Sequence, residues 1–98
     1  MKNLDVIEEL WLVIQDRKAN PKKGSYTNEL LNSEKKIFEK LREELGEIEE
    51  AVKAGRVSTS EKDSLAWEAS DFIYHLLVLL AAKGVDIEDV LKELKRRR

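Results

Sequence analysis

Residues 68–82 read EASDFIYHLLVLLAA, and this stretch decides the fold. Between Phe72 and Ala82 only Tyr74 and His75 carry polar side-chain atoms, so a helix here is apolar on nearly every side. Such a helix is buried over most of its surface, and the other segments of a 98-residue chain can cover only part of it. We therefore expect a second copy of the chain to cover the rest, in a homodimer or a higher homo-oligomer.

The segments on both sides of this stretch also follow helical patterns. Apolar residues recur at helical spacing over 4–19, and Pro21 ends that helix because the residue before a proline avoids the helical conformation. The predicted fold is all-α, with four to five helices in a single domain over residues 1–98. Capping residues mark the other helix starts: Ser25 or Thr27 for a short helix to Leu31, Ser33 for 34–54, Ser60 with Asp63 for the central helix to residue 83, and Asp86 for 87–95.

The composition excludes several classes of protein. The 18 basic and 20 acidic residues give a net charge of −2, which does not favour nucleic-acid binding. Cysteine is absent, so disulfides and zinc–cysteine sites are excluded. No signal peptide is visible, and the longest apolar run, residues 76–82, is far shorter than the ~20 residues of a membrane span. We expect a cytoplasmic protein that binds neither nucleic acid nor a membrane.

Two pairs of carboxylates lie at i, i+3 spacing on two of these helices. Glu44 and Glu47 lie beside the apolar stripe of the third helix, and Glu68 and Asp71 share one face of the fourth with His75. If these helices pack antiparallel, four carboxylates meet, and oxygen ligands in that number suit Mg²⁺ or Mn²⁺. Because Mg²⁺ usually shares its ligand shell with substrate phosphates, the pattern indicates phosphate chemistry.

This interpretation has a simpler alternative. Twenty acidic residues in 98 make the E-x-x-E spacing common, and Glu47 and Glu50 also have it, as on a solvated helix face. Glu68 and Asp71 differ, because they are the only acids between residues 65 and 82, next to a segment that should be buried. A buried carboxylate is costly without a partner, so a cation or a basic side chain is expected there. Taken alone, His75 is most simply a histidine of the core.

The spacing of the four acids is similar to the signature of a known family. Glu44-x-x-Glu47, twenty intervening residues and Glu68-x-x-Asp71 resemble the all-α nucleoside triphosphate pyrophosphohydrolases, the MazG-like superfamily. The resemblance narrows to the phosphoribosyl-ATP pyrophosphohydrolase family over residues 10–96, although Ser33 and Arg42 stand where that family is expected to have glycine. The segments that resemble its S-Y-T, K-V-G-E-E and E-A-A-D-L-L-Y-H-L-L-V-L-L motifs are residues 25–27 (SYT), 40–44 (KLREE) and 68–80 (EASDFIYHLLVLL).

The resemblance implies a reaction in which phosphoribosyl-ATP and water give phosphoribosyl-AMP and pyrophosphate, the second step of histidine biosynthesis. It also implies Mg²⁺ as cofactor, with Mn²⁺ as a substitute, and a MazG-like oligomeric helical bundle. The metal ligands implied are Glu44, Glu47, Glu68 and Asp71, and the candidates for orienting or deprotonating the attacking water are Glu43, Glu44 and Glu47. The candidate substrate-binding residues are Arg17, Ser25, Tyr26, Thr27, Lys40 and His75, and a solvated charge is an equal alternative for Arg17.

Two other functions fit the sequence. One is a housecleaning pyrophosphohydrolase of the same superfamily that acts on another (d)NTP, which a turnover comparison of nucleotides would identify. The other is a non-enzymatic helical interaction module. A module of this kind predicts no Mg²⁺ binding and no release of pyrophosphate from any nucleotide.

Overall fold

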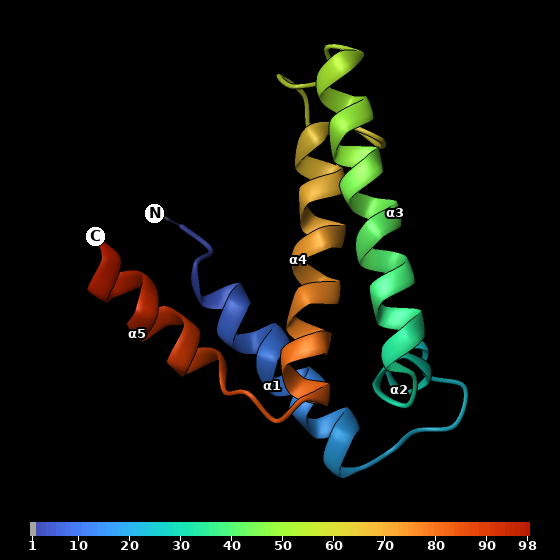
Figure 1. Cartoon of the computed structure of the whole chain (residues 1–98), viewed down its shortest axis with the longest axis vertical. Coiled ribbons are helices and arrows are strands. Elements are labelled where there is room, and N and C mark those ends of the chain that lie inside the picture. Colours follow the sequence, from blue (N-terminus) through green and yellow to red (C-terminus); the bar gives the residue numbers. More distant parts are fainter. Residues whose placement is uncertain (1) are drawn as a thin grey trace.

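Two long helices, α3 (Glu34–Lys53) and α4 (Leu65–Ala82), lie side by side and antiparallel in the computed structural model, which describes residues 2–98 (Figure 1). The helix α1 (Asp5–Ala19) crosses the lower half of α4, and the short α2 (Tyr26–Leu31) lies at the lower end of α3. The last helix is α5 (Ile87–Arg97). Residues 2–98 contain no strand, so the prediction of an all-α fold with up to five helices is confirmed.

The core is formed by the inward faces of α1 to α4. Trp11 and Ile14 on α1 and Ile37 on α3 are buried, and Leu30 of the short α2 is completely buried. Burial of one such side chain contributes roughly 1.5–3 kcal/mol. Because α4 packs against α1, α2 and α3, the polar side chains on its inner face are enclosed together with the apolar ones.

Side-chain caps fix the starts of three helices where the sequence predicts them. The hydroxyl of Ser25 accepts a hydrogen bond from the backbone N–H of Asn28, and Ser33 does the same at the start of α3. Asp86 caps α5 through the backbone N–H of Glu88. The serine at position 33, where glycine is expected in the family, therefore has a structural role: it accepts the N-terminal hydrogen bond of α3.

The predicted start of α4 is wrong. Asp63 has a φ of 66°, in the left-handed region, so it cannot belong to the first turn of a right-handed helix capped by Ser60. The cap is Ser64, whose hydroxyl accepts from the backbone N–H of Trp67. Arg56 fixes the loop before it, because its Nε donates to the Asp63 carbonyl over 2.7 Å and its own carbonyl accepts from the N–H of Leu65 over 2.8 Å.

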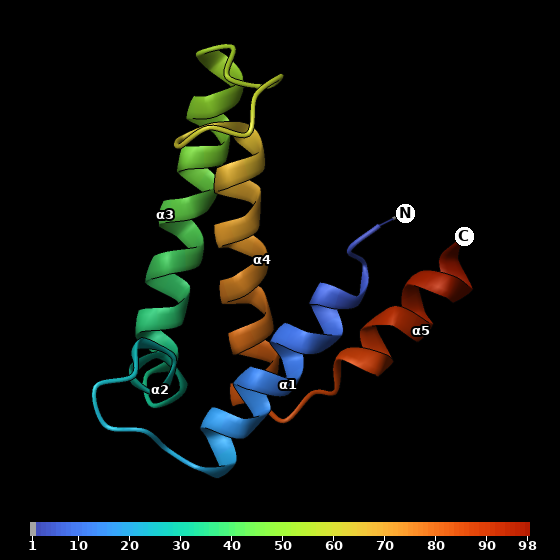
Figure 2. The same cartoon turned by 180° about the vertical axis from the view of Figure 1, so that it is seen from behind.

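The two ends of the chain project together from the α3–α4 pair. Figure 2 shows α5 extending on the same side as α1, and a groove between them is lined by Ile7, Trp11 and Leu91. No residue of α5 is buried, although Leu91 and Leu94 give it an apolar face. The expected end of this helix at residue 95 is two residues short of the observed one.

By length and composition, α4 is the one helix within residues 2–98 that could cross a membrane. A core helix of a soluble protein passes the same test. Here α4 packs against three other helices and carries Glu68, Asp71 and His75. Packing within the protein accounts for part of its apolar surface, because 28% of this helix is buried and Ile73 and Leu76 remain exposed.

Candidate active site

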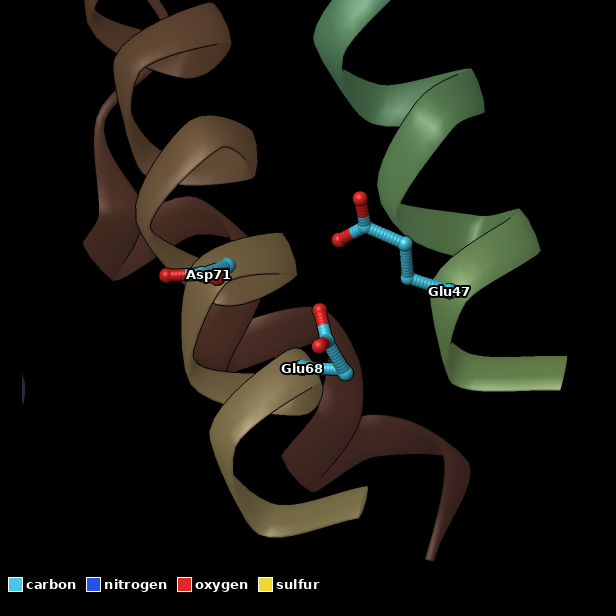
Figure 3. A group of neighbouring side chains, drawn as sticks. All are labelled: Glu47, Glu68 and Asp71. Atoms are coloured by element: carbon cyan, nitrogen blue, oxygen red, sulfur yellow. The ribbon is translucent and has the colours of Figure 1, made fainter. Parts of the chain in front are cut away.

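Three carboxylates converge where α3 and α4 pack side by side (Figure 3). Glu47 extends from α3 towards α4, on which Glu68 and Asp71 lie about one turn apart. Each of the three offers an oxygen atom, and these oxygens all lie within 4.8 Å of one another. The structure thus brings together three of the four predicted metal ligands, on the two antiparallel helices that the sequence assigned to them.

Burial makes this cluster costly without a cation. Glu68 is only 4% exposed, and its Oε2 atom has no hydrogen-bond partner. The Glu47 carboxylate, with which Glu68 can share a proton, raises the pKa of Glu68 to about 7, with further contributions from burial and from the charge of Asp71. Carboxylate oxygens, one of them buried and unpartnered, are the donor set that a hard divalent cation prefers, so the cluster fits Mg²⁺ or Mn²⁺.

Glu44, the fourth predicted ligand, lies outside this group of three and against His75. Its Oε1 atom lies 2.6 Å from His75 Nδ1, and both side chains are buried. Nδ1 also lies 2.8 Å from the backbone carbonyl oxygen of Asp71, and Oε1 touches the ring without a hydrogen-bond partner. Burial, followed by the charge of Asp71, raises the pKa of Glu44 to about 7.

The short helix α2 supplies the second partner of His75. Tyr26, its first residue, places Oη 2.9 Å from His75 Nε2. Beside it, the Thr27 hydroxyl is hydrogen-bonded to the hydroxyl of Tyr74. Two side chains of α2 are therefore attached to α4, and both belong to the S-Y-T segment, residues 25–27. The third member of that segment, Ser25, uses its hydroxyl to cap the helix.

Lys40, one turn before Glu44 on α3, forms an ion pair with Glu43. The Lys40 ammonium lies 3.2 Å from the Glu43 carboxylate, and both side chains reach solvent. Burial lowers the pKa of Lys40, but the hydrogen bond and charge of Glu43 outweigh it, and the pKa is raised. Lys40 thus remains a cation beside Tyr26 and Glu44, at the edge of the carboxylates.

Two arginines, Arg17 and Arg56, have surroundings that the sequence did not predict. Arg17, a predicted substrate-binding residue, pairs with Asp16 over 3.3 Å on the surface of α1. Its backbone carbonyl accepts from the Asn28 side chain, which ties α1 to α2. Arg56, which sequence analysis did not single out, lines a pocket of about 150 Å³ with Glu47 and Glu68. Arg56 lies in a loop, where no helical periodicity marks a residue as part of a site.

The chain is similar to known proteins over nearly all of its length. The sequence profile of a family described as "Phosphoribosyl-ATP pyrophosphohydrolase" matches residues 7–98. A "Phosphoribosyl-ATP pyrophosphatase" of Clostridium novyi is 46% identical over 99 residues, covering 100% of this chain and 86% of the relative. The protein of the same name from Methanocella arvoryzae is 44% identical over 97 residues, covering 96% of this chain and 97% of the relative.

One relative is a longer protein. The "Histidine biosynthesis bifunctional protein HisIE" of Caldanaerobacter subterraneus is 40% identical over 95 residues, which cover 96% of this chain but 44% of the relative. The present chain therefore corresponds to one part of that bifunctional protein.

Proposed function

Since the chain belongs to the phosphoribosyl-ATP pyrophosphohydrolase family, we propose that it hydrolyses phosphoribosyl-ATP to phosphoribosyl-AMP and pyrophosphate. This reaction is a step of histidine biosynthesis and occurs in the cytoplasm. The observation that carries the proposal is the group of three carboxylates on α3 and α4, because a triphosphate is recognised through cations and this group can hold one.

The proposed metal ligands are Glu47, Glu68 and Asp71, with Glu44 beside them as the fourth. The unpartnered Oε2 of Glu68 supports this assignment, since a buried carboxylate oxygen needs a cation or a donor. Mg²⁺ is the proposed ion and Mn²⁺ a substitute. When bound, such an ion neutralises charge on the triphosphate and makes water a better nucleophile.

Glu44 is the favoured group for orienting the attacking water and accepting its proton. Its pKa of about 7 lies where a general base works at neutral pH. Glu43 is less suited, because it is solvent-exposed and engaged with Lys40. Glu47 is the third candidate and already lies in the group of three. Because Oε1 lies against His75 Nδ1, Oε2 is the oxygen that Glu44 offers to an ion or to the attacking water.

The substrate phosphates have two candidate partners among the basic residues. Lys40 lies beside Glu44 and can exchange its exposed partner Glu43 for a phosphate oxygen. Arg56 already donates through Nε to Asp63, and its guanidinium has further donors beside the carboxylates. Arg17, Ser25, Tyr26, Thr27 and His75 remain predicted substrate-binding residues, although the Ser25 hydroxyl and both ring nitrogens of His75 are already engaged within the protein.

Exposed apolar side chains support the proposed homodimer or higher homo-oligomer. Phe38, Leu45 and Val52 recur every seven residues on α3 and are exposed, and so are Ile73 and Leu76 on α4. Residues seven apart lie on one face of a helix, so the three residues of α3 form a stripe and not a scatter of single residues. A second copy of the chain would cover it with a matching stripe.

A turnover comparison tests the proposed reaction against the two alternatives. Purified protein with Mg²⁺ is given phosphoribosyl-ATP, the ordinary (d)NTPs or oxidised NTPs, and pyrophosphate release is followed. We expect phosphoribosyl-ATP to have the highest kcat/KM. A higher kcat/KM for another nucleotide would identify the housecleaning pyrophosphohydrolase, and no release from any of them would favour the non-enzymatic module.

A further inference from the structure

We infer that His75 is a positioning residue, whose Nδ1 edge sets the place of the Glu44 carboxylate, and that the Tyr26 hydroxyl holds the ring in the tautomer this requires. The inference rests on the proposed function in giving Glu44 a role at the carboxylate site. The inference goes beyond the proposed function because it gives Tyr26 and His75 a supporting role in place of a substrate-binding role.

The hydrogen bonds of the ring determine its tautomer. The Asp71 carbonyl, 2.8 Å from Nδ1, can only accept, so Nδ1 carries the proton. Nε2 is then the acceptor, and the Tyr26 hydroxyl donates to it over 2.9 Å. In the opposite tautomer two acceptors would face each other at Nδ1, and Tyr26 could no longer donate to Nε2.

The ring is also fixed in orientation. Tyr26 and Tyr74 pack against it edge to face, with ring centroids 5.9 Å and 5.0 Å away. His75 is 5% exposed, so no substrate atom can reach its nitrogens without displacing these partners. The clamped ring then limits where the Glu44 carboxylate lies, because Oε1 contacts Nδ1 at 2.6 Å and leaves Oε2 for an ion or a water.

These contacts connect three different helices of the chain. Tyr26 is on α2, His75 on α4 and Glu44 on α3, and Tyr26 and His75 are 49 residues apart. A histidine that served only the core would need its nitrogens satisfied and nothing more. A positioning histidine must also change the properties of Glu44 when its tautomer changes, and this difference can be measured.

The neighbouring tyrosines provide a matched pair of variants. Tyr26→Phe removes the hydroxyl that donates to His75, whereas Tyr74→Phe removes a hydroxyl that is bonded to Thr27 and keeps its ring against the histidine. Each variant loses one oxygen atom and keeps an aromatic ring. Tyr26 is partly exposed, so its replacement should leave the fold intact, which circular dichroism and thermal melts would verify.

The first measurement is the tautomer of His75, in chelator at pH 8. His75 is the only histidine of the chain, so its two ring ¹⁵N resonances need no assignment strategy. We expect the parent and Tyr74→Phe to have a protonated Nδ1 and an unprotonated Nε2. In Tyr26→Phe the two tautomers should become mixed, because the donor to Nε2 is gone.

The second measurement is the affinity for Mn²⁺ by isothermal titration calorimetry. Supporting partners of metal ligands typically change metal affinity by roughly 10–100-fold, and we expect Tyr26→Phe to weaken binding by about 10-fold. Tyr74→Phe should bind like the parent. The melting temperatures of both variants are measured as well. A loss of Mn²⁺ affinity that comes only from a destabilised fold would then be accompanied by a lower melting temperature.

Three results would overturn the inference. Parent-like tautomer and Mn²⁺ affinity in Tyr26→Phe would show that the hydroxyl positions nothing. Unchanged Mn²⁺ affinity with a raised KM and an unchanged kcat would make Tyr26 a substrate contact instead. A parent that binds no Mn²⁺ would remove the metal site itself, and this failure of the proposed function is distinguishable because it is seen before any substitution.

Discussion

The Glu44 carboxylate and the His75 ring are in contact inside the protein, with Oε1 2.6 Å from Nδ1 and both side chains buried. This contact lies between the two long helices, close enough to Asp71 and Glu47 for their charges to raise the pKa of Glu44. A fold of 98 residues has a small core, and placing ionisable groups in it lowers its stability. A cation bound to the carboxylates would offset this loss of stability.

Neutralising one carboxylate of the group should abolish pyrophosphate release. Glu47→Gln and Asp71→Asn keep the size of each side chain and remove the negative charge that attracts the ion. We expect a loss of about 10²-fold or more in kcat, the size of effect seen when a major electrostatic stabiliser is removed. Glu49→Gln is the matched control, because Glu49 is on the same helix, exposed and paired with Lys53. Near-parental activity of Asp71→Asn at saturating Mg²⁺ would contradict the assignment.

Removing the charge of Glu68 should not destabilise the metal-free protein. Glu68 is buried next to other carboxylates and has no basic partner within hydrogen-bond distance. Glu68→Gln should therefore melt at or above the parent in chelator. Mg²⁺ at a hundred times its Kd should stabilise the parent by about 2.7 kcal/mol through linkage and the variant by much less. If the variant is clearly less stable in chelator and both proteins ignore Mg²⁺, Glu68 belongs to a structural ion pair instead.

The metal-free protein should lose stability as the pH rises through neutrality. The pKa values of Glu44 and Glu68 are raised in the folded state from 4.5 to about 7. Between these values the folded state binds more protons than the unfolded state, so the free energy of unfolding decreases with rising pH. Two and a half pH units at about 1.4 kcal/mol each give up to about 3.5 kcal/mol for one group.

Urea melts in chelator at pH 5 and pH 8 measure this loss. The double variant Glu44→Gln, Glu68→Gln is the control for all other titrating groups, and its stability should change less between the two pH values. A parent that is equally stable or more stable at pH 8, relative to this control, would show that the two carboxyls are not protonated near neutral pH.

The exposed apolar residues of α3 and α4 should mediate self-association. Leu76→Glu places a charge on the exposed face of α4, where Leu76 is 40% exposed, so the core of the chain is not disturbed. We expect a dimer or larger species for the parent at micromolar concentration and a monomer for the variant, by sedimentation or light scattering. Val57→Glu, at an exposed apolar position in the loop before α4, should leave the assembly unchanged. A monomeric parent would refute the proposed oligomer.

Much of the fold was predictable because local signals agree with the tertiary packing. The caps at Ser25, Ser33 and Asp86 and the left-handed Gly55 and Gly84 mark helix ends directly in the sequence. The start of α4 was not predictable, because Ser60 and Ser64 can both act as a cap there. Ser64 caps the helix because the chain reverses at Asp63, which Arg56 holds through its carbonyl.

The sequence predicted the residue types of the candidate site better than the contacts between them. Spacing alone placed two pairs of carboxylates on two helices, and the structure brings Glu47, Glu68 and Asp71 together. Spacing could not show that Glu44 lies against His75 or that Tyr26 reaches that ring, because these contacts depend on where α2 docks. The loop residue Arg56 was missed for the same reason, since its position is set by tertiary contacts.

Pyrophosphate release from phosphoribosyl-ATP, measured as a function of Mg²⁺ concentration for the parent and Glu68→Gln, tests the central claim most directly. We predict no release by the parent in chelator, saturable release as Mg²⁺ is added, and at least about 10²-fold less release by Glu68→Gln at every concentration. Release that is equally fast in chelator and in Mg²⁺, or equally fast in both proteins, would contradict the account.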